Sequence, residues 1–97
     1  MDDRKIYIDK LASQLKTWDD DIKKFETKAK NSASNVRSQI ESKISEMRIK
    51  KTKFEKQFNE LKNSGVDAWK EIKNGIEKAE NNMKDSVINA KEKFMDN

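Results

Sequence analysis

The sequence predicts an all-α protein, and three observations support this prediction. Proline is absent and glycine occurs only twice, so few positions would interrupt a helix. Good helix formers such as Lys, Glu, Ala and Leu are abundant. The apolar residues recur at helical spacing instead of being scattered. With 97 residues there is room for one domain, which we expect to be a single helical coiled-coil domain over residues 1–97.

The first third of the chain carries a heptad pattern. Its apolar positions step alternately by three and four residues from Ile8 to Val36, and Ser32 is the one polar residue among them. Such a seam is typical of a helix that packs on another helix, because one apolar stripe cannot bury itself. We therefore predict that its first part forms an interface between chains. The predicted interface residues are Ile8, Leu11, Leu15, Trp18, Ile22 and Phe25.

The seam continues through the middle of the chain after one irregular step. Between Val36 and Met47 the spacing becomes four, four and three, a stutter that locally relaxes a left-handed supercoil. Lys51 then occupies the seam position before Phe54, where a charged side chain can snorkel or fix the register. Since residues 31–35 contain neither Gly nor Pro, we favour one continuous helix over about residues 3–62.

The last third of the chain shows an eleven-residue repeat. Ala68, Ala79 and Ala90 are eleven residues apart, and so are Leu61, Ile72, Met83 and Phe94. This period is typical of a nearly straight or slightly right-handed helix. The apolar face is wide enough to contact two neighbouring helices or a lipid surface.

The clearest break in the helical pattern lies at residues 63–66. Asn63 and Gly65 suit a helix C-terminus, and Ser64 followed by Asp67 predicts a capping box for the next helix. The chain would then fold as an elongated antiparallel hairpin, or coiled coil, with a second helix over about residues 67–95. The predicted hairpin core comprises Met47, Phe54, Phe58, Leu61, Trp69, Ile72, Ile76, Met83 and Phe94.

One structural alternative stays open at this point. If the chain also turned at residues 31–35, it would form three helices of nearly equal length. These could close into an up-down-up bundle with a core of its own.

Two Trp-containing motifs and a closing motif carry a family likeness. They are Leu11-x-x-Gln14-Leu15-x-x-Trp18-Asp19-x-x-Ile22, Leu61-Lys62-x-Ser64-Gly65-x-Asp67-Ala68-Trp69-x-x-Ile72-x-x-Gly75 and Ala90-Lys91-x-Lys93-Phe94. Together they resemble a group of small, poorly characterised bacterial coiled-coil proteins with Lys/Glu-rich, apolipoprotein-like helical repeats. The resemblance implies an elongated, soluble, non-enzymatic helical protein with a stress or envelope-associated role. The chain departs from the family pattern at residues 31–35, where members tend to be rich in Ala and Lys.

Several classes of chemistry are excluded by composition. Without Cys or His there is no disulfide bond, no thiol chemistry and no imidazole base for a catalytic triad. The run Asp19–Asp21 does not suit a metal, because consecutive helical side chains point about 100° apart. Paired carboxylates also need a dry cleft before their pKa values can shift. We expect no enzymatic activity, no metal and no cofactor.

We interpret the chain as a scaffold protein that self-associates, as a homo-oligomer of two or more chains, through exposed helical surface. The alternative is reversible binding to a membrane surface by amphipathic helices, with Lys70, Lys73, Lys84 and Lys91 beside the apolar face. The basic segment 48–53 spreads around the helix, so it gives little support for nucleic-acid binding. No apolar run approaches the roughly 20 residues of a membrane span, and no secretory signal is evident. We expect a cytoplasmic protein.

Overall fold

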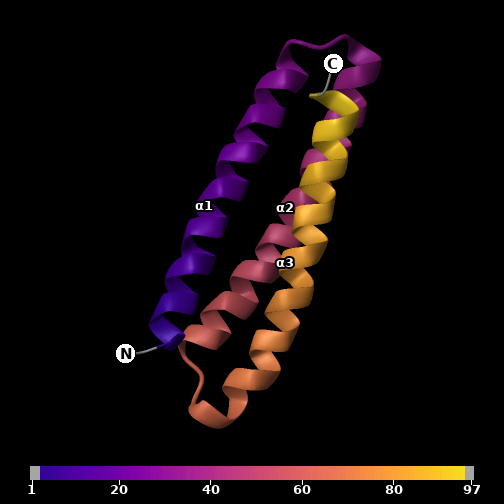
Figure 1. Cartoon of the computed structure of the whole chain (residues 1–97). Coiled ribbons are helices and arrows are strands. Elements are labelled where there is room, and N and C mark those ends of the chain that lie inside the picture. Colours follow the sequence, from indigo (N-terminus) through magenta and orange to yellow (C-terminus); the bar gives the residue numbers. More distant parts are fainter. Residues whose placement is uncertain (1–2, 96–97) are drawn as a thin grey trace.

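The fold is a three-helix bundle. The computed structural model describes residues 3–95, and it contains α1 (Asp3–Lys30), α2 (Ser34–Lys62) and α3 (Val66–Phe94) in an up-down-up arrangement (Figure 1). α2 runs antiparallel to the other two helices and packs closely along both of them. α1 and α3 run in the same direction and approach each other much less closely. The all-α prediction is confirmed.

The continuous helix predicted over about residues 3–62 is wrong. α1 ends at Lys30 and α2 begins at Ser34, so the chain turns at the segment that we expected to stay helical. The longest dimension of the bundle is 50 Å, whereas an unbroken helix over residues 3–62 would measure about 90 Å. The turn is favourable because it lets the seam of α1 bury itself against α2 of the same chain. The three-helix alternative is therefore the arrangement that the structure adopts.

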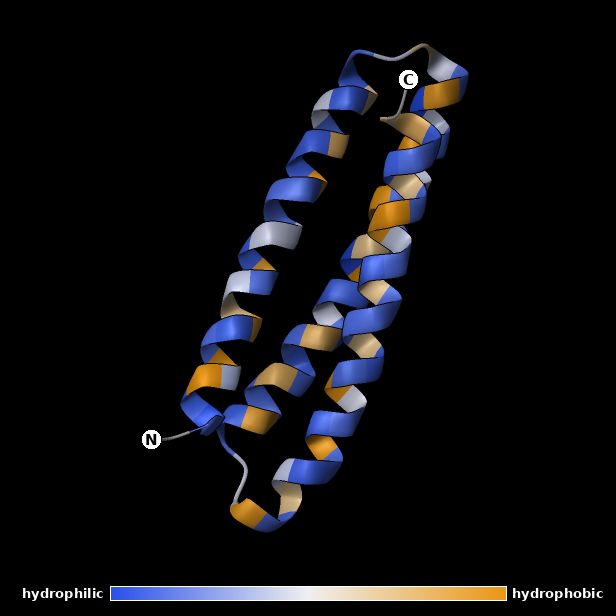
Figure 2. Ribbon diagram, in the orientation of Figure 1, coloured by the Kyte–Doolittle hydropathy of each residue, from blue (hydrophilic) through white to orange (hydrophobic). Residues whose placement is uncertain are grey.

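The core extends along the whole bundle. All three helices carry apolar residues at intervals between hydrophilic ones, as Figure 2 shows. Trp18 of α1 packs edge to face on Phe54 of α2, with ring centroids 4.8 Å apart and an interplanar angle of 83°. The buried apolar residues are Leu11, Trp18, Ile22, Phe25, Ala29, Ile40, Ile44, Met47, Phe54, Phe58, Leu61, Ile76, Met83, Val87 and Ala90.

The residues predicted to join two chains lie within this one-chain core. Leu11, Trp18, Ile22 and Phe25 are buried, and Ile8 and Leu15 are partly buried against the same cluster. In this arrangement the seam is not exposed to a second chain, because α1 folds back on α2. Of the nine residues predicted for the hairpin core, six are buried and three pack at its edge. The edge residues are Trp69, Ile72 and Phe94.

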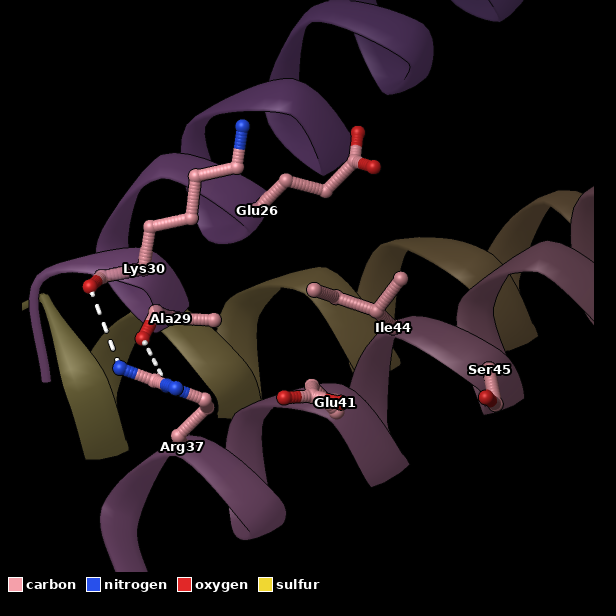
Figure 3. Close-up of a pocket in the computed structure, with 7 residues that line it drawn as sticks. All are labelled: Glu26, Ala29, Lys30, Arg37, Glu41, Ile44 and Ser45. Carbon is pink, nitrogen blue, oxygen red and sulfur yellow. Dashed lines mark hydrogen bonds between the residues drawn. The ribbon is translucent and has the colours of Figure 1, made fainter. Parts of the chain in front are cut away.

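The first turn is held by a side chain from α2. The Arg37 Nε donates to the carbonyl of Ala29 at 3.1 Å, and its Nη2 lies 3.4 Å from the carbonyls of Lys30 and Ser32. The carbonyls of Ala29 and Lys30 are at the end of α1, where a helix leaves its last C=O groups unpaired, and that of Ser32 lies in the turn. Figure 3 shows the guanidinium reaching across the turn to α1. A cation at this position also complements the helix dipole.

The second turn lies at residues 63–65, close to its predicted place, but the predicted capping box is wrong. The N-cap of α3 is Gly65, which has no side-chain cap hydrogen bond. The hydroxyl of Ser64 instead donates to the carbonyl of Leu61 at 2.8 Å and so closes the end of α2. Within the described residues, no helix is both long and apolar enough to cross a membrane.

Candidate functional site

The acidic run in α1 serves to join helices. Asp19 pairs with Lys51 of α2, and the nearly buried Asp21 pairs with Lys91 of α3 at 3.3 Å. The carboxylates thus point toward different helices. Among residues 3–95 no group of three or more carboxylates is arranged to hold a metal ion. Lys51, the charged residue in the predicted seam, links α2 to α1 in this way.

The basic run of α2 is also largely paired. Arg48 reaches Glu26 of α1 at 2.8 Å, and Lys50 reaches Glu46 at 3.1 Å. With Lys51 bound to Asp19, three of the four cations in segment 48–53 face a carboxylate. These ion pairs tie the basic run to carboxylates of α1 and of α2 itself.

An open groove of about 640 Å³ lies beside the first turn (Figure 3). Its lining mixes both signs of charge with two buried apolar side chains, those of Ala29 and Ile44. Arg37 there hydrogen-bonds the end of α1, and Glu26 forms an ion pair with Arg48. The groove therefore belongs to the turn and offers no converging set of reactive groups.

A distinct cluster forms where α1 and α3 begin, and we refer to it as the aromatic end of the bundle. Tyr7 and Trp69 pack edge to face there, with ring centroids 6.0 Å apart and an interplanar angle of 71°. Arg4 lies 4.6 Å from the centre of the Trp69 ring, and Lys73 lies 4.8 Å from that of Tyr7. Arg4 also donates to the carbonyl of Ser64 at 2.9 Å, which ties α1 to the second turn.

Two aliphatic side chains are exposed at this same end. Val66, the first residue of α3, is 80% exposed, and Ile6, in the first turn of α1, is 55% exposed. Partly buried aromatic rings, cations against their faces and exposed aliphatic groups thus occur together. This combination suits contact with a surface that is apolar inside and anionic outside.

Sequence reasoning identified only part of the aromatic end. It placed Trp69 in a hairpin core and Lys70 and Lys73 beside an apolar face, but it assigned no role to Tyr7 or Arg4. The missing information was the fold, because only a turn at residues 31–33 brings the start of α1 next to the start of α3. The usable signal was that α1 and α3 each have an aromatic residue among cations near their start.

The electrostatics of the aromatic end are clearest at Tyr7. Burial, together with the negative charges of Glu77 and Glu80, raises the pKa of Tyr7 from its ordinary value near 10 to about 12. Within the described residues the phenol oxygen has no hydrogen-bond partner. The neutral phenol is thus the form that the folded protein favours.

Alkaline titration should reveal this shift. Because the unfolded chain loses the Tyr7 proton first, the contribution of Tyr7 to stability is complete below pH 10 and is lost as the pH rises toward about 12. After allowance for partial exposure we expect a loss of about 1–2 kcal/mol relative to Tyr7→Phe. Tyr7 is the chain's single tyrosine, so tyrosinate absorbance reports it directly. A folded-state midpoint near 10, equal to that in urea, would contradict the prediction.

Comparisons of the chain with models of known protein families, with curated proteins and with solved structures found no match.

Proposed function

We propose that this protein is a non-enzymatic interaction protein that docks reversibly on anionic membrane surfaces through the aromatic end of its bundle. The observation that carries this proposal is the exposure of Val66 and Ile6 beside the Tyr7–Trp69 pair and its cations. Trp and Tyr favour the membrane–water interface, where an apolar body and a polar edge are both accommodated.

Charge favours the same kind of surface. The chain carries a formal net charge of +4, and Arg4 and Lys73 lie directly against the two rings. Cationic side chains near a membrane are attracted to anionic headgroups, with an energy of about 1 kcal/mol each. The cytoplasmic location expected from the sequence would place the protein near an anionic leaflet.

This mode of binding differs from the one that the repeat of α3 suggested. The apolar residues Ile76, Met83 and Val87 of that face are buried, and Lys91 is engaged by Asp21. The face could insert into lipid only if the bundle opened. The aromatic end requires no such opening, so the closed bundle can dock as it stands.

Vesicle binding tests the proposal. We expect the protein to co-sediment with vesicles of phosphatidylcholine and phosphatidylserine, to bind phosphatidylcholine alone much less, and to dissociate as salt is raised. In the variant Trp18→Phe, Trp69 is the one remaining tryptophan, and its emission should shift to the blue on binding. Val66→Asp should lower the partition coefficient by about tenfold or more, because it replaces an inserting aliphatic group with a charge.

A matched control is available on α2. Ile49 is 71% exposed but lies near the middle of its helix, away from the aromatic end. Ile49→Asp therefore makes the same change of charge and should bind vesicles like the unmodified protein. Equal losses in both variants, or no binding to anionic vesicles, would contradict docking by this end.

A further inference from the structure

The first turn combines features that suit an exchange of α1 between two copies of the chain. We propose that residues 31–33 are a hinge, and that straightening it joins α1 and α2 into one helix and places α1 on the α2–α3 pair of a second copy. The partner is thus a second copy of this chain, and the contacts used are those that already close the monomer.

The hinge can become helical without a change in the sign of any φ. Ala33 has φ −63° and ψ 158°, so its φ is that of an α-helix and only its ψ departs from one. No described residue has a positive φ, and the hinge contains neither Gly nor Pro. The second turn is different, because Gly65 disfavours a continuous helix there. Straightening should therefore occur at residues 31–33 and not at 63–65.

The hinge also lacks the stabilisation that most helix starts receive. Ala33 is the N-cap of α2 and offers no side-chain hydrogen bond, so the first N–H groups of α2 have no such cap. In a continuous helix the N–H groups of Ser34 and Val36 would bond the carbonyls of Lys30 and Ser32, which Arg37 now contacts. Arg37 is thus the main side chain that holds the closed form.

The sequence pattern runs through the hinge without a change of phase. Ala29, Ser32 and Val36 keep the three-and-four spacing, so a continuous helix would present one unbroken seam. Release of α1 breaks its close packing on α2 and its side-chain contacts with α3, among them those of Tyr7 and Asp21. The exchanged dimer would regain the same contacts, for example that of Trp18 on Phe54, across two chains. Short hinge loops favour such exchange between protomers.

Variants of the hinge should shift the equilibrium in opposite directions. Replacing Asn31, Ser32 and Arg37 by Ala raises helix propensity and removes the hydrogen bonds from Arg37. We expect the dimerisation constant to rise by at least about a hundredfold. Ser34→Pro should lower it by more than about a thousandfold, because Pro is tolerated at the first residue of α2 but not inside a continuous helix. The extended conformation of Ala33 suits a following proline.

Light scattering and small-angle scattering over a range of concentrations give the mass and length. The exchanged dimer should measure about 90 Å or more, against 50 Å for the monomer. Adding Ser34→Pro to the triple Ala variant should return it to a monomer, which also shows that the Ala variant has kept its fold. A triple Ala variant that stays monomeric at every concentration would overturn the proposal.

Cross-linking distinguishes exchange from ordinary association. The chain has no cysteine, so Glu26→Cys and Arg48→Cys introduce two thiols at one exposed contact between α1 and α2. A short bis-maleimide should join these thiols within one chain in the Ser34→Pro monomer, and between two chains in the dimer of the triple Ala variant. Links within single chains in that dimer would show that α1 is not exchanged. The experiment needs no lipid, so its result is independent of membrane docking.

Discussion

Trp18→Ala should lower the free energy of unfolding by about 3–5 kcal/mol. Trp18 is 2% exposed and packs edge to face on Phe54 of α2. Truncation would leave a large apolar cavity between the two helices, and aromatic pairs of this kind contribute beyond the area that they bury. In a domain of this size the midpoint of thermal unfolding should fall by about 15–30 °C.

Urea unfolding followed by circular dichroism, at two or more protein concentrations, measures this effect. Thr17→Ala is the matched control, because Thr17 is the exposed neighbour whose hydroxyl bonds only within its own helix. Its stability should stay within about 0.5 kcal/mol of the unmodified protein. If Trp18→Ala changed the mass of the particle but not the stability of the monomer, Trp18 would belong to an interface between chains, as the sequence first predicted.

Ala90→Asp should also be strongly destabilising, by about 3–5 kcal/mol. Ala90 is 0% exposed, so a carboxylate introduced there would be buried without a designed partner. A buried, uncompensated charge costs several kcal/mol, and the small space around an alanine adds steric strain. We expect reduced helicity at 37 °C and a large shift of the urea midpoint.

The control comes from the repeat itself. Ala68 holds the same position in the eleven-residue repeat as Ala90, yet it lies exposed in the first turn of α3. Ala68→Asp places a negative charge at a helix N-terminus, where the dipole favours it, so its stability should be unchanged or slightly raised. Similar losses in the two variants would mean that the repeat alone determines burial.

This contrast shows where periodicity is a sufficient guide and where it is not. The spacing of apolar residues correctly predicted helix along almost the whole chain, and it predicted which face of each helix is apolar. Both properties are local, because they depend on residues three and four positions apart. The same spacing could not tell Ala90 from Ala68, since burial depends on which helix covers each position.

The candidate site was predictable only in part for the same reason. Trp69 and Lys73 were singled out from α3 alone, but Tyr7 and Arg4 come from the start of the chain. These four residues meet only because α1 and α3 begin at the same end of the bundle. The position of the aromatic end therefore depends on the number of turns in the chain.

The sequence by itself determined three things: the helical class, the apolar faces and the turn at residues 63–65, which Gly65 marks. Tertiary structure alone decided whether the chain turns at residues 31–33. Nothing local forbids a helix there, and a continuous helix would satisfy more backbone hydrogen bonds. The seam of α1 has no partner within the chain unless it folds back, so its burial against α2 outweighs those few bonds. That gain comes from contacts between residues far apart in the sequence, so no local pattern reveals it.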